Sequence, residues 1–459
     1  MTQSLRGQKG HPEILDFETF AQWVTQHHPL SYGADLQLGL GDSEVQSARG
    51  NFDPNIYSSI YDKYFDSRTY YKQRSAGLKI PTWFGIEAQI NFDQNSGLNL
   101  NPEVRTPNSG LIRAGISIPL GKNLFIDKRR AQLQKAKLYK ESTIAVRKNM
   151  LNDLLLNAGQ AYWDWFSSYH ALNIHSEAWE AAKARRAAVV QTVSFGDRPA
   201  IDTVEASIQV QNRSIGYLNA QLAYKNNSQL LSIYLWKDGI TPMKLADSIK
   251  PIALKTIDTF NQKYIFQKNV DSILKNHPTL IQSRLRVEQN QVLQRLAAEQ
   301  LKPNLQLNYN ALLEPLGSNT LSSYSNQNYI WGLDFRIPIF LRKERGKLNQ
   351  SKIDVKQAQY DLLKKEAMIN YKINASLNEW KNSQDLLGIY SKTVNNYSIL
   401  LNGERKRFSG GESSLFMVNS RELGYINSQI KFTQMVAKTH QFKLKTIHAL
   451  GILYEMDKP

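Results

Sequence analysis

Apolar residues recur every three or four positions along one very long stretch of the chain, from Ile126 to about Ser194. The recurring residues are Leu151, Leu154, Leu155, Ala158, Ala161, Tyr162, Trp165, Tyr169 and Leu172. Proline is absent from this stretch and glycine is rare, so a 3.6-residue period can persist and predicts a single helix over 126–194. At 1.5 Å per residue, such a helix is roughly 100 Å long. Because no compact soluble core is that long, we expect a coiled coil, a repeat or an elongated bundle.

The chain is internally duplicated at an offset of 215 residues. Without any gap, the offset aligns Lys128 with Lys343, Arg130 with Arg345, Leu133 with Leu348, Trp165 with Trp380, Gly196 with Gly411, Asn212 with Asn427 and Leu235 with Leu450. A second long helix is therefore expected over 342–408, with a similar apolar stripe that includes Leu348, Val355, Ile373 and Trp380.

Strict alternation of apolar and polar residues predicts β-strands ahead of each long helix. In the second half, the strands are expected at 304–312 and 328–338. In the first half, the alternation covers 84–92 and 112–118, within a strand region of 53–120. The first half is about 30 residues longer here, and the excess falls in the aromatic segment 53–80, whose place in a sheet the sequence leaves open.

Two strands per repeat give four per chain, too few to close a barrel. The alternation fits a transmembrane β-barrel completed by several chains, and it fits an ordinary half-buried antiparallel sheet equally well.

The predicted organisation is a pair of tandem repeats. Residues 1–12 are a disordered or added N-terminal segment; repeat 1 covers 13–235, with a first helix at 30–48, the strand region, the long helix and a return helix at 201–235. A connecting segment spans 236–276; repeat 2 covers 277–453, with a helix at 280–301, two strands, the long helix and a return helix at 414–450; residues 454–459 form a tail. The polar N-terminus lacks the apolar region of a secretory signal.

Composition narrows the function classes. Of 459 residues, 41% are hydrophobic and none is cysteine, which excludes disulfides, thiolate metal sites and cysteine nucleophiles. No apolar run is long enough for a membrane-spanning helix, and the P-loop, HExxH and GxSxG motifs are absent. The sequence therefore predicts neither an enzyme nor a resident cofactor or metal.

The formal net charge of +17 comes mostly from Lys and Arg spread among Glu and Gln, which is typical of a solvated helix face. One basic cluster is local, and each of its halves follows a predicted strand: Lys128, Arg129 and Arg130 in the first repeat, and Arg342, Lys343 and Arg345 in the second. A basic cluster often marks nucleic acid or an anionic surface, and the alternative is ordinary solvated charge.

Glycine marks the turn after each long helix. The first turn runs through Phe195, Gly196 and Asp197, and the second through Ser409, Gly410 and Gly411. Glycine suits the left-handed residue that ends a helix, Asp or Ser is expected to cap the next one, and Pro199 suits its first turn.

The duplicated order of helix, strands, very long helix, glycine turn and return helix resembles the TolC-like outer-membrane efflux proteins. Local motifs agree: Phe52-Asp53-Pro54, Ile118-Pro119-Leu120-Gly121 leading into Ile126–Ala131, and Phe195-Gly196 ahead of Asp202. The resemblance covers about residues 15–453 and implies an α+β membrane protein, a homotrimer in which a β-hairpin from each repeat contributes to a 12-stranded outer-membrane β-barrel. The long helices are expected to form a periplasmic α-barrel.

The resemblance implies an exit channel for small molecules or polypeptides in a Gram-negative outer membrane, as in efflux pumps and type I secretion. Its expected partners are outer-membrane lipid, a periplasmic adaptor protein and an inner-membrane transporter, without nucleic acid. The absent signal would then have preceded this sequence.

The resemblance also assigns roles to individual residues. The polar strand faces would line the barrel lumen through Glu87, Gln89, Asn91, Gln306, Asn308, Asp334 and Arg336. The basic cluster that follows the strands would lie near the periplasmic rim, where it would touch lipid phosphates, favour anions in the lumen or carry ordinary solvated charge. The glycine turns would dock the adaptor through Phe195, Gly196, Asp197, Ser409, Gly410 and Gly411. The pore constriction would involve Arg198, Asp202, Glu412, Met417 and Ser420, with Arg198 and Glu412 as latch residues. Because Met417 stands where the second repeat would repeat Asp202, an acidic gate is reduced here, and Asp202 could instead be an ordinary first-turn carboxylate.

A cytoplasmic coiled-coil scaffold or nucleic-acid-binding protein is the alternative suggested by the missing signal and the positive charge. It leaves the alternating strands and the 215-residue repeat unexplained.

Overall fold

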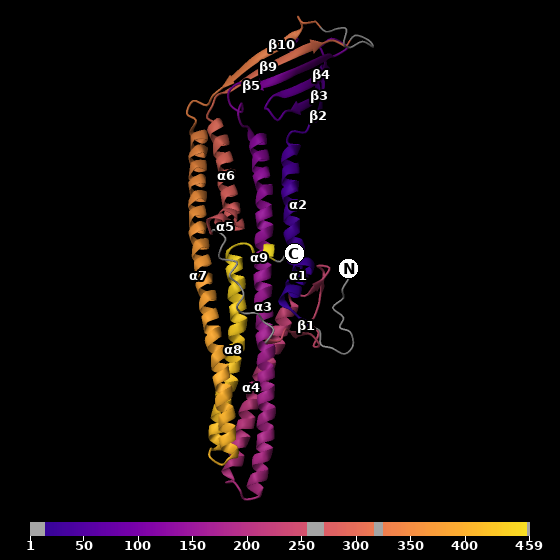
Figure 1. Cartoon of the computed structure of the whole chain (residues 1–459). Coiled ribbons are helices and arrows are strands. Elements are labelled where there is room, and N and C mark those ends of the chain that lie inside the picture. Colours follow the sequence, from indigo (N-terminus) through magenta and orange to yellow (C-terminus); the bar gives the residue numbers. More distant parts are fainter. Residues whose placement is uncertain (1–13, 255–269, 316–324, 457–459) are drawn as a thin grey trace. The chain divides into compact units, whose positions relative to one another are not determined.

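The computed structural model describes residues 14–254, 270–315 and 325–456. The segment 1–12 and part of the connecting segment 236–276 lie outside these ranges. In chain order, the elements are β1 (Ile14–Leu15), α1 (Phe17–His27), α2 (Pro29–Gly50), β2 (Asn55–Phe65), β3 (Arg68–Pro81), β4 (Glu87–Ser96), the 3-10 turn η1 (Pro102–Val104), β5 (Leu111–Pro119), α3 (Lys128–Ser194), α4 (Ile201–Ser232), β6 (Trp236–Lys237), β7 (Thr241–Pro242), β8 (Lys250–Pro251), α5 (Val270–Asn276), α6 (Pro278–Glu299), β9 (Asn304–Leu313), β10 (Tyr329–Arg336), α7 (Arg342–Ser409), α8 (Leu415–Ala449) and α9 (Leu453–Met456) (Figure 1).

Both very long helices are present. α3 has 67 residues and α7 has 68, and their ends differ from the expected ones by two residues or fewer. The described residues contain no helix that is both long and apolar enough to cross a membrane.

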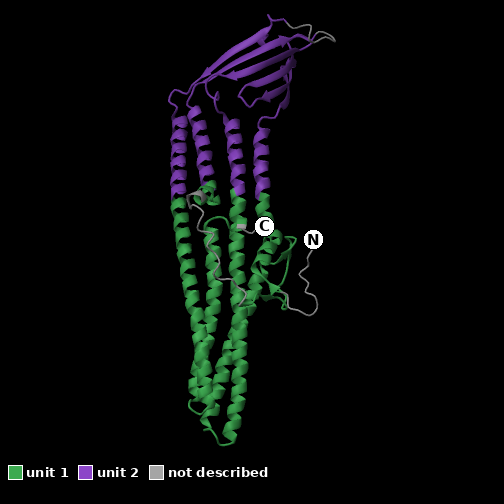
Figure 2. Cartoon of the chain, in the orientation of Figure 1, with its two compact units in different colours: residues 1–36, 145–281, 364–459 green, residues 37–144, 282–363 purple. Residues whose placement is uncertain are grey.

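The chain divides into two compact units (Figure 2). Unit 1 comprises residues 1–36, 145–281 and 364–459, and unit 2 comprises 37–144 and 282–363. The division cuts across the sequence repeats, because each repeat contributes segments to both units. The helices α2, α3, α6 and α7 each have residues in both.

Unit 2 contains one antiparallel sheet of six strands in the order β10-β9-β5-β4-β3-β2. The expectation of four strands per chain was therefore wrong. The difference is the segment 53–80, which forms the hairpin β2–β3 and pairs with β4 from Lys72–Ser96 to Pro81–Glu87. Polar residues on both sides of this hairpin dilute its alternation, which is why the pattern was ambiguous.

The core of unit 1 is built on the apolar stripe of α3. Tyr162, Trp165 and Phe166 are fully buried, together with Phe20 and Val24 of α1. The cluster also takes in Leu231, Leu387, Val436, Leu444 and Ile447 from α4, α7 and α8. The three- and four-residue spacing of the stripe thus places its side chains on the face that other helices cover.

A half-buried histidine packs against this core. His440 of α8 stacks on Trp163 of α3, with ring centroids 4.0 Å apart and planes 8° from parallel. Burial, helped by the positive charge of Lys443, lowers the pKa of His440 from 6.5 to about 3. The native state therefore holds this ring neutral at neutral pH.

This lowered pKa predicts an acid-sensitive core. Between pH 6.5 and about 3, the unfolded chain binds a proton at His440 that the folded chain does not bind, so the free energy of unfolding falls as the pH falls, by about 1.4 kcal/mol per pH unit from this residue. His440→Phe keeps a flat ring and removes the titration. Thermal unfolding followed by circular dichroism from pH 7 to 4.5 should show a smaller loss of stability in the variant, and equal losses in both proteins would contradict the assignment.

Candidate functional site

The sheet of unit 2 has one polar face, and its side chains are joined across the strands. Gln89 donates to Asn310 (Nε2 to Oδ1, 3.0 Å), and Asn308 donates to Asp334 (Nδ2 to Oδ2, 2.7 Å). Further bonds run from Tyr57 to Asn91, from Ser117 to Asn308, from Gln306 to Ser117 and from Arg113 to Asp93. The polar groups of this face are thus extensively paired with one another, as a hydrogen-bonded network across the strands.

The residues predicted to line a lumen lie on this face. Glu87, Gln89 and Asn91 are in β4, Gln306 and Asn308 in β9, and Asp334 and Arg336 in β10. The strand register pairs Asp334 with Gln306 and Gly332 with Asn308, so the predicted residues of β9 and those of β10 lie on the same side of the sheet. Sequence reasoning missed Tyr57 and Lys79, because their segment had not been assigned to the sheet.

The opposite face is apolar and exposed. One row of directly paired residues crosses all six strands: Ile56, Leu78, Ile90, Ala114, Ala311 and Tyr329. Ile56 is 86% exposed and Trp331 of β10 is 62% exposed. A continuous apolar surface of this kind marks contact with lipid or with another protein.

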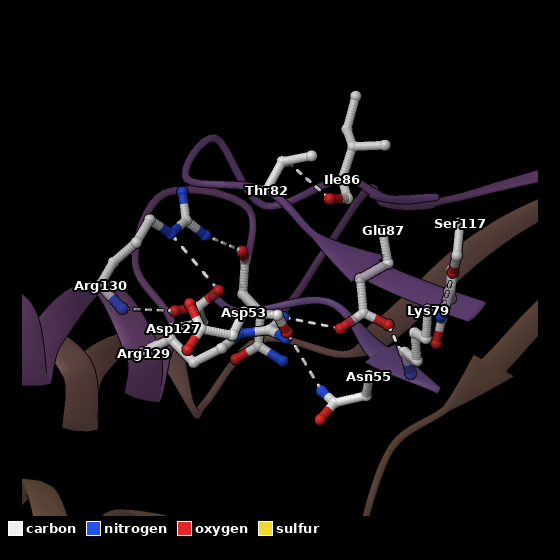
Figure 3. Close-up of polar contacts among 12 residues, drawn as sticks. Asp53, Asn55, Lys79, Thr82, Ile86, Glu87, Ser117, Asp127, Arg129 and Arg130 are labelled. Carbon is white, nitrogen blue, oxygen red and sulfur yellow. Dashed lines mark hydrogen bonds and ion pairs between the residues drawn. The ribbon is translucent and has the colours of Figure 1, made fainter. Parts of the chain in front are cut away.

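A polar groove of about 520 Å³ lies where the strands meet the start of α3. Its lining comprises Lys79, Gly85, Glu87, Ser117, Pro119, Lys122, Asn123, Asp127, Lys128, Arg129, Gln300, Asn304 and Gln306. Glu87 accepts from Lys79 (2.7 Å) and from Arg129 (2.6 Å), which ties β3, β4 and α3 together (Figure 3). This pairing neutralises much of the positive charge at that point.

The basic residues predicted at this end have different surroundings. Arg130 contacts the Asp127 carboxylate (Nε to Oδ2, 3.4 Å) and donates to the backbone carbonyls of Asn123 and Leu124 (Figure 3). Among the described residues, Lys122 and Lys128 have no ion-pair partner, so they are the two unneutralised cations of the groove. The second set, Arg342, Lys343 and Arg345, starts α7, is exposed and does not line the groove.

The two glycine turns have the same geometry. Gly196 (φ +80°) and Gly411 (φ +79°) adopt the left-handed conformation. In the first turn, Gly196 N donates to Val193 O and Asp197 N to Thr192 O; in the second, Gly411 N donates to Phe408 O and Glu412 N to Arg407 O. These are Schellman motifs at equivalent positions of the two repeats, with glycine where a side chain would be strained.

The residues around the turns bond locally. Ser414 caps α8 by accepting from Met417 N, as expected of a serine there. α4 begins after Ala200 with no side-chain cap, so the expectation of a capping Asp or Ser was wrong for this helix. Asp202 instead lies in the first turn of α4 and contacts Arg198 at 3.4 Å. Arg198 also stacks over the Phe408 ring, and Glu412 lies 3.9 Å from Arg407. Met417 is half-buried and Ser420 is exposed.

A buried cluster of charges near the turns joins four helices. Glu422 of α8 is only 5% exposed and accepts two bonds from Arg185 of α3 (2.6 and 2.8 Å). Arg405 of α7 lies 3.1 Å away and Arg213 of α4 lies 4.0 Å away. Burial pushes the pKa of Glu422 up, but the bonds from Arg185 and the three positive charges outweigh it and hold that pKa below its usual value. Sequence patterns did not predict this cluster, because each residue resembles a solvated helix charge.

Comparison with known proteins was made for the sequence and for the fold. Residues 269–420 match the family described as outer membrane efflux protein. No curated protein matches the sequence. Three of the most similar solved structures are the outer membrane channel CmeC of Campylobacter jejuni (14% identity, covering 95% of this chain and 86% of that one, TM-score 0.64), the outer membrane protein VceC of Vibrio cholerae (14%, 95% and 96%, 0.67) and the open state of the MtrE outer membrane channel of Neisseria gonorrhoeae (12%, 95% and 88%, 0.66).

The Glu422 cluster predicts a large effect of one substitution. Glu422→Gln leaves three arginines facing a neutral group, and removing one partner of a buried ion pair costs about 3–5 kcal/mol. We expect a lower thermal midpoint by circular dichroism, and a similar loss in the parent protein as the pH falls through the lowered pKa of Glu422. The control is Glu412→Gln, at a carboxylate that is 73% exposed, which should have little effect. Equal midpoints for the two variants would show that the cluster does not stabilise the helices.

The likeness drawn from the sequence is thus confirmed: this chain resembles the TolC-like outer-membrane efflux proteins, by the family match over residues 269–420 and by the fold of their solved channels over 95% of its length.

Proposed function

We propose that this chain is the outer-membrane exit channel of a Gram-negative export system, working as a homotrimer with a periplasmic adaptor and an inner-membrane transporter. The observation that carries the proposal is the sheet of unit 2, whose one face is a polar hydrogen-bonded network and whose other face is an exposed apolar surface. In a closed barrel the polar face lines water and the apolar face meets lipid. The adaptor and the transporter follow from the family likeness.

Aromatic residues at one end of the sheet support the membrane assignment. Trp83 and Phe84 lie in the β3–β4 connection, Phe125 follows β5 and Phe340 follows β10, and all four are exposed. The strand register puts these positions beyond the same end of the sheet, because Glu87 pairs with Ser117 and Arg336 with Asn304. Aromatic girdles at a membrane interface have this arrangement.

An exposed apolar seam on α4 supports assembly. Its members are Ile201, Val204, Ile208, Ile215, Leu218 and Leu222, each 48% exposed or more. Their spacing of three, four and seven residues is that of a coiled-coil contact. In the proposed trimer this seam packs on helices of a neighbouring copy, and the buried face of α4 packs within its own chain.

The function is tested by reconstitution. The chain, extracted in detergent, should behave as a trimer by light scattering and should give discrete conductance steps in planar lipid bilayers. A monomer that forms no pores, or a protein recovered from cells without detergent, would overturn the proposal in favour of a soluble scaffold.

The seam predicts a specific assembly defect. Ile215→Glu combined with Leu218→Glu places two charges in the contact, and we expect the trimer fraction to fall at least tenfold, since charges at core positions of a coiled coil oppose association. Asn212→Glu, on the same helix but outside the seam, is the matched control and should leave the trimer intact. Light scattering in detergent measures both, and an unchanged trimer in the double variant would mean that α4 faces solvent.

The ion selectivity of the channel should depend on the two groove lysines that have no ion-pair partner in the described chain, and less on the arginine that is already paired. Lys122→Gln with Lys128→Gln should lower the preference for anions, seen as a shift of the reversal potential in a salt gradient, because these two charges have no counter-charge. Arg130→Gln should change it less, since that guanidinium is held by Asp127 and backbone carbonyls. A larger shift for Arg130→Gln would contradict this account of the groove.

A further inference from the structure

The sheet of unit 2 ends on two open strands. β10 has eight residues and β2 has eleven, and neither has a neighbour on its outer side within the described chain. β2 contains no proline, and its only irregularity is a register shift at Lys63–Tyr64, near its end. Natural open edges are usually protected by prolines, bulges, charged side chains or short length. The charged residues of β2, Asp62 and Lys63, lie next to its irregularity. Residues 55–61 have no such protection, so a partner strand is expected there.

The hairpin β2–β3 is an integral part of the sheet. Tyr57 of β2 reaches across Gly77 of β3 to bond Asn91 of β4, and a Cβ atom at Gly77 would collide with both side chains. On the other face, Ile56 and Leu78 extend the apolar row of β4, β5 and β9 to the edge. At the rows of Tyr57 and Ile56, the polar face and the apolar face therefore both continue through β3 to β2. Farther along the hairpin, Ser58, Asp62 and Arg74 place polar groups on the apolar side.

The two edges are complementary. Every neighbouring pair in the six-stranded sheet is antiparallel, so the first and last strands run in opposite directions. A second copy, related by rotation about a barrel axis, then places its β2 antiparallel to β10 of the first copy. The polar faces of the two copies lie on the same side of the continuous sheet. In hydrocarbon, the free backbone groups of both edges are satisfied only by such closure.

We infer that β2 of each copy pairs with β10 of the next, and that the barrel of the trimer is closed by eighteen strands, three copies of the six found here. The inference rests on the proposed trimeric channel and fixes how its copies join. Barrel diameter grows roughly in proportion to strand number, so this wall is roughly 1.5 times as wide as one of twelve strands. The alternative is a barrel in which the hairpin β2–β3 detaches and β10 pairs with β4 of the next copy.

Because the sequence contains no cysteine, the pairing of β2 with β10 of the next copy can be tested by cross-linking introduced cysteines. Leu333→Cys on β10 is combined in turn with Ile56→Cys, Ser58→Cys or Ile60→Cys on β2, which cover the possible registers on the apolar face. The comparison variants combine Leu333→Cys with Ile90→Cys on β4 or with Leu78→Cys on β3. Each protein is first shown to be trimeric in detergent, then treated with a short bismaleimide and separated on a denaturing gel.

We expect covalent trimers from at least one of the β10–β2 cysteine pairs. The β10–β4 and β10–β3 pairs should give at least tenfold less covalent trimer. Cross-linking of Leu333→Cys to Ile90→Cys in place of the β2 positions would overturn the inference while leaving the trimeric channel intact. Trimers with no cross-link at any β2 position would also overturn it. A protein that is monomeric before treatment would instead overturn the proposed function.

Discussion

The constraint on which the unit 2 sheet depends is that backbone donors and acceptors at its edges need partners. Each strand in the interior of the sheet has two neighbours, whereas β2 and β10 each have one. In water a solvated edge is tolerable. In the lipid surroundings of the proposed channel it is not, because lipid next to the apolar row from Ile56 to Tyr329 offers no hydrogen-bonding groups. Under that proposal, further copies of the chain complete the sheet.

The helices of unit 1 meet a different requirement. The helices α3, α4, α7 and α8 must keep one register relative to one another. The apolar core around Trp165 supplies most of the burial, but apolar contacts alone allow helices to slide. The Glu422 cluster takes one arginine from each of α3, α4 and α7, and its bidentate bond from Arg185 has a defined geometry. We infer that this directional ionic contact near the glycine turns favours one register of the four helices.

Much of this architecture could be predicted from the sequence, and the failures have physical causes. The helices α3 and α7 and the turns at Gly196 and Gly411 follow from periodicity and glycine placement, which are local signals. The strands β4, β5, β9 and β10 alternate cleanly because each separates a polar from an apolar side. The hairpin β2–β3 mixes serine, tyrosine and charge on both sides, so only its pairing with β4 identifies it. The Glu422 cluster depends on partners from three other helices, and no local pattern reports them.

The position of the extra hairpin also explains why the duplication could tolerate it. α2 leads into β2 and β5 leads into α3, and the register puts the start of β2 and the end of β5 at the same end of the sheet, since Asn55 pairs with Lys79, Lys79 with Gln89 and Glu87 with Ser117. Only an even number of strands between those helices returns the chain to that end. One added strand would have sent α3 the wrong way and made the two sheet edges parallel. A pair of strands preserves both the helix connections and the opposite directions of the two edge strands, so the first repeat could widen the sheet without altering the helices that follow it.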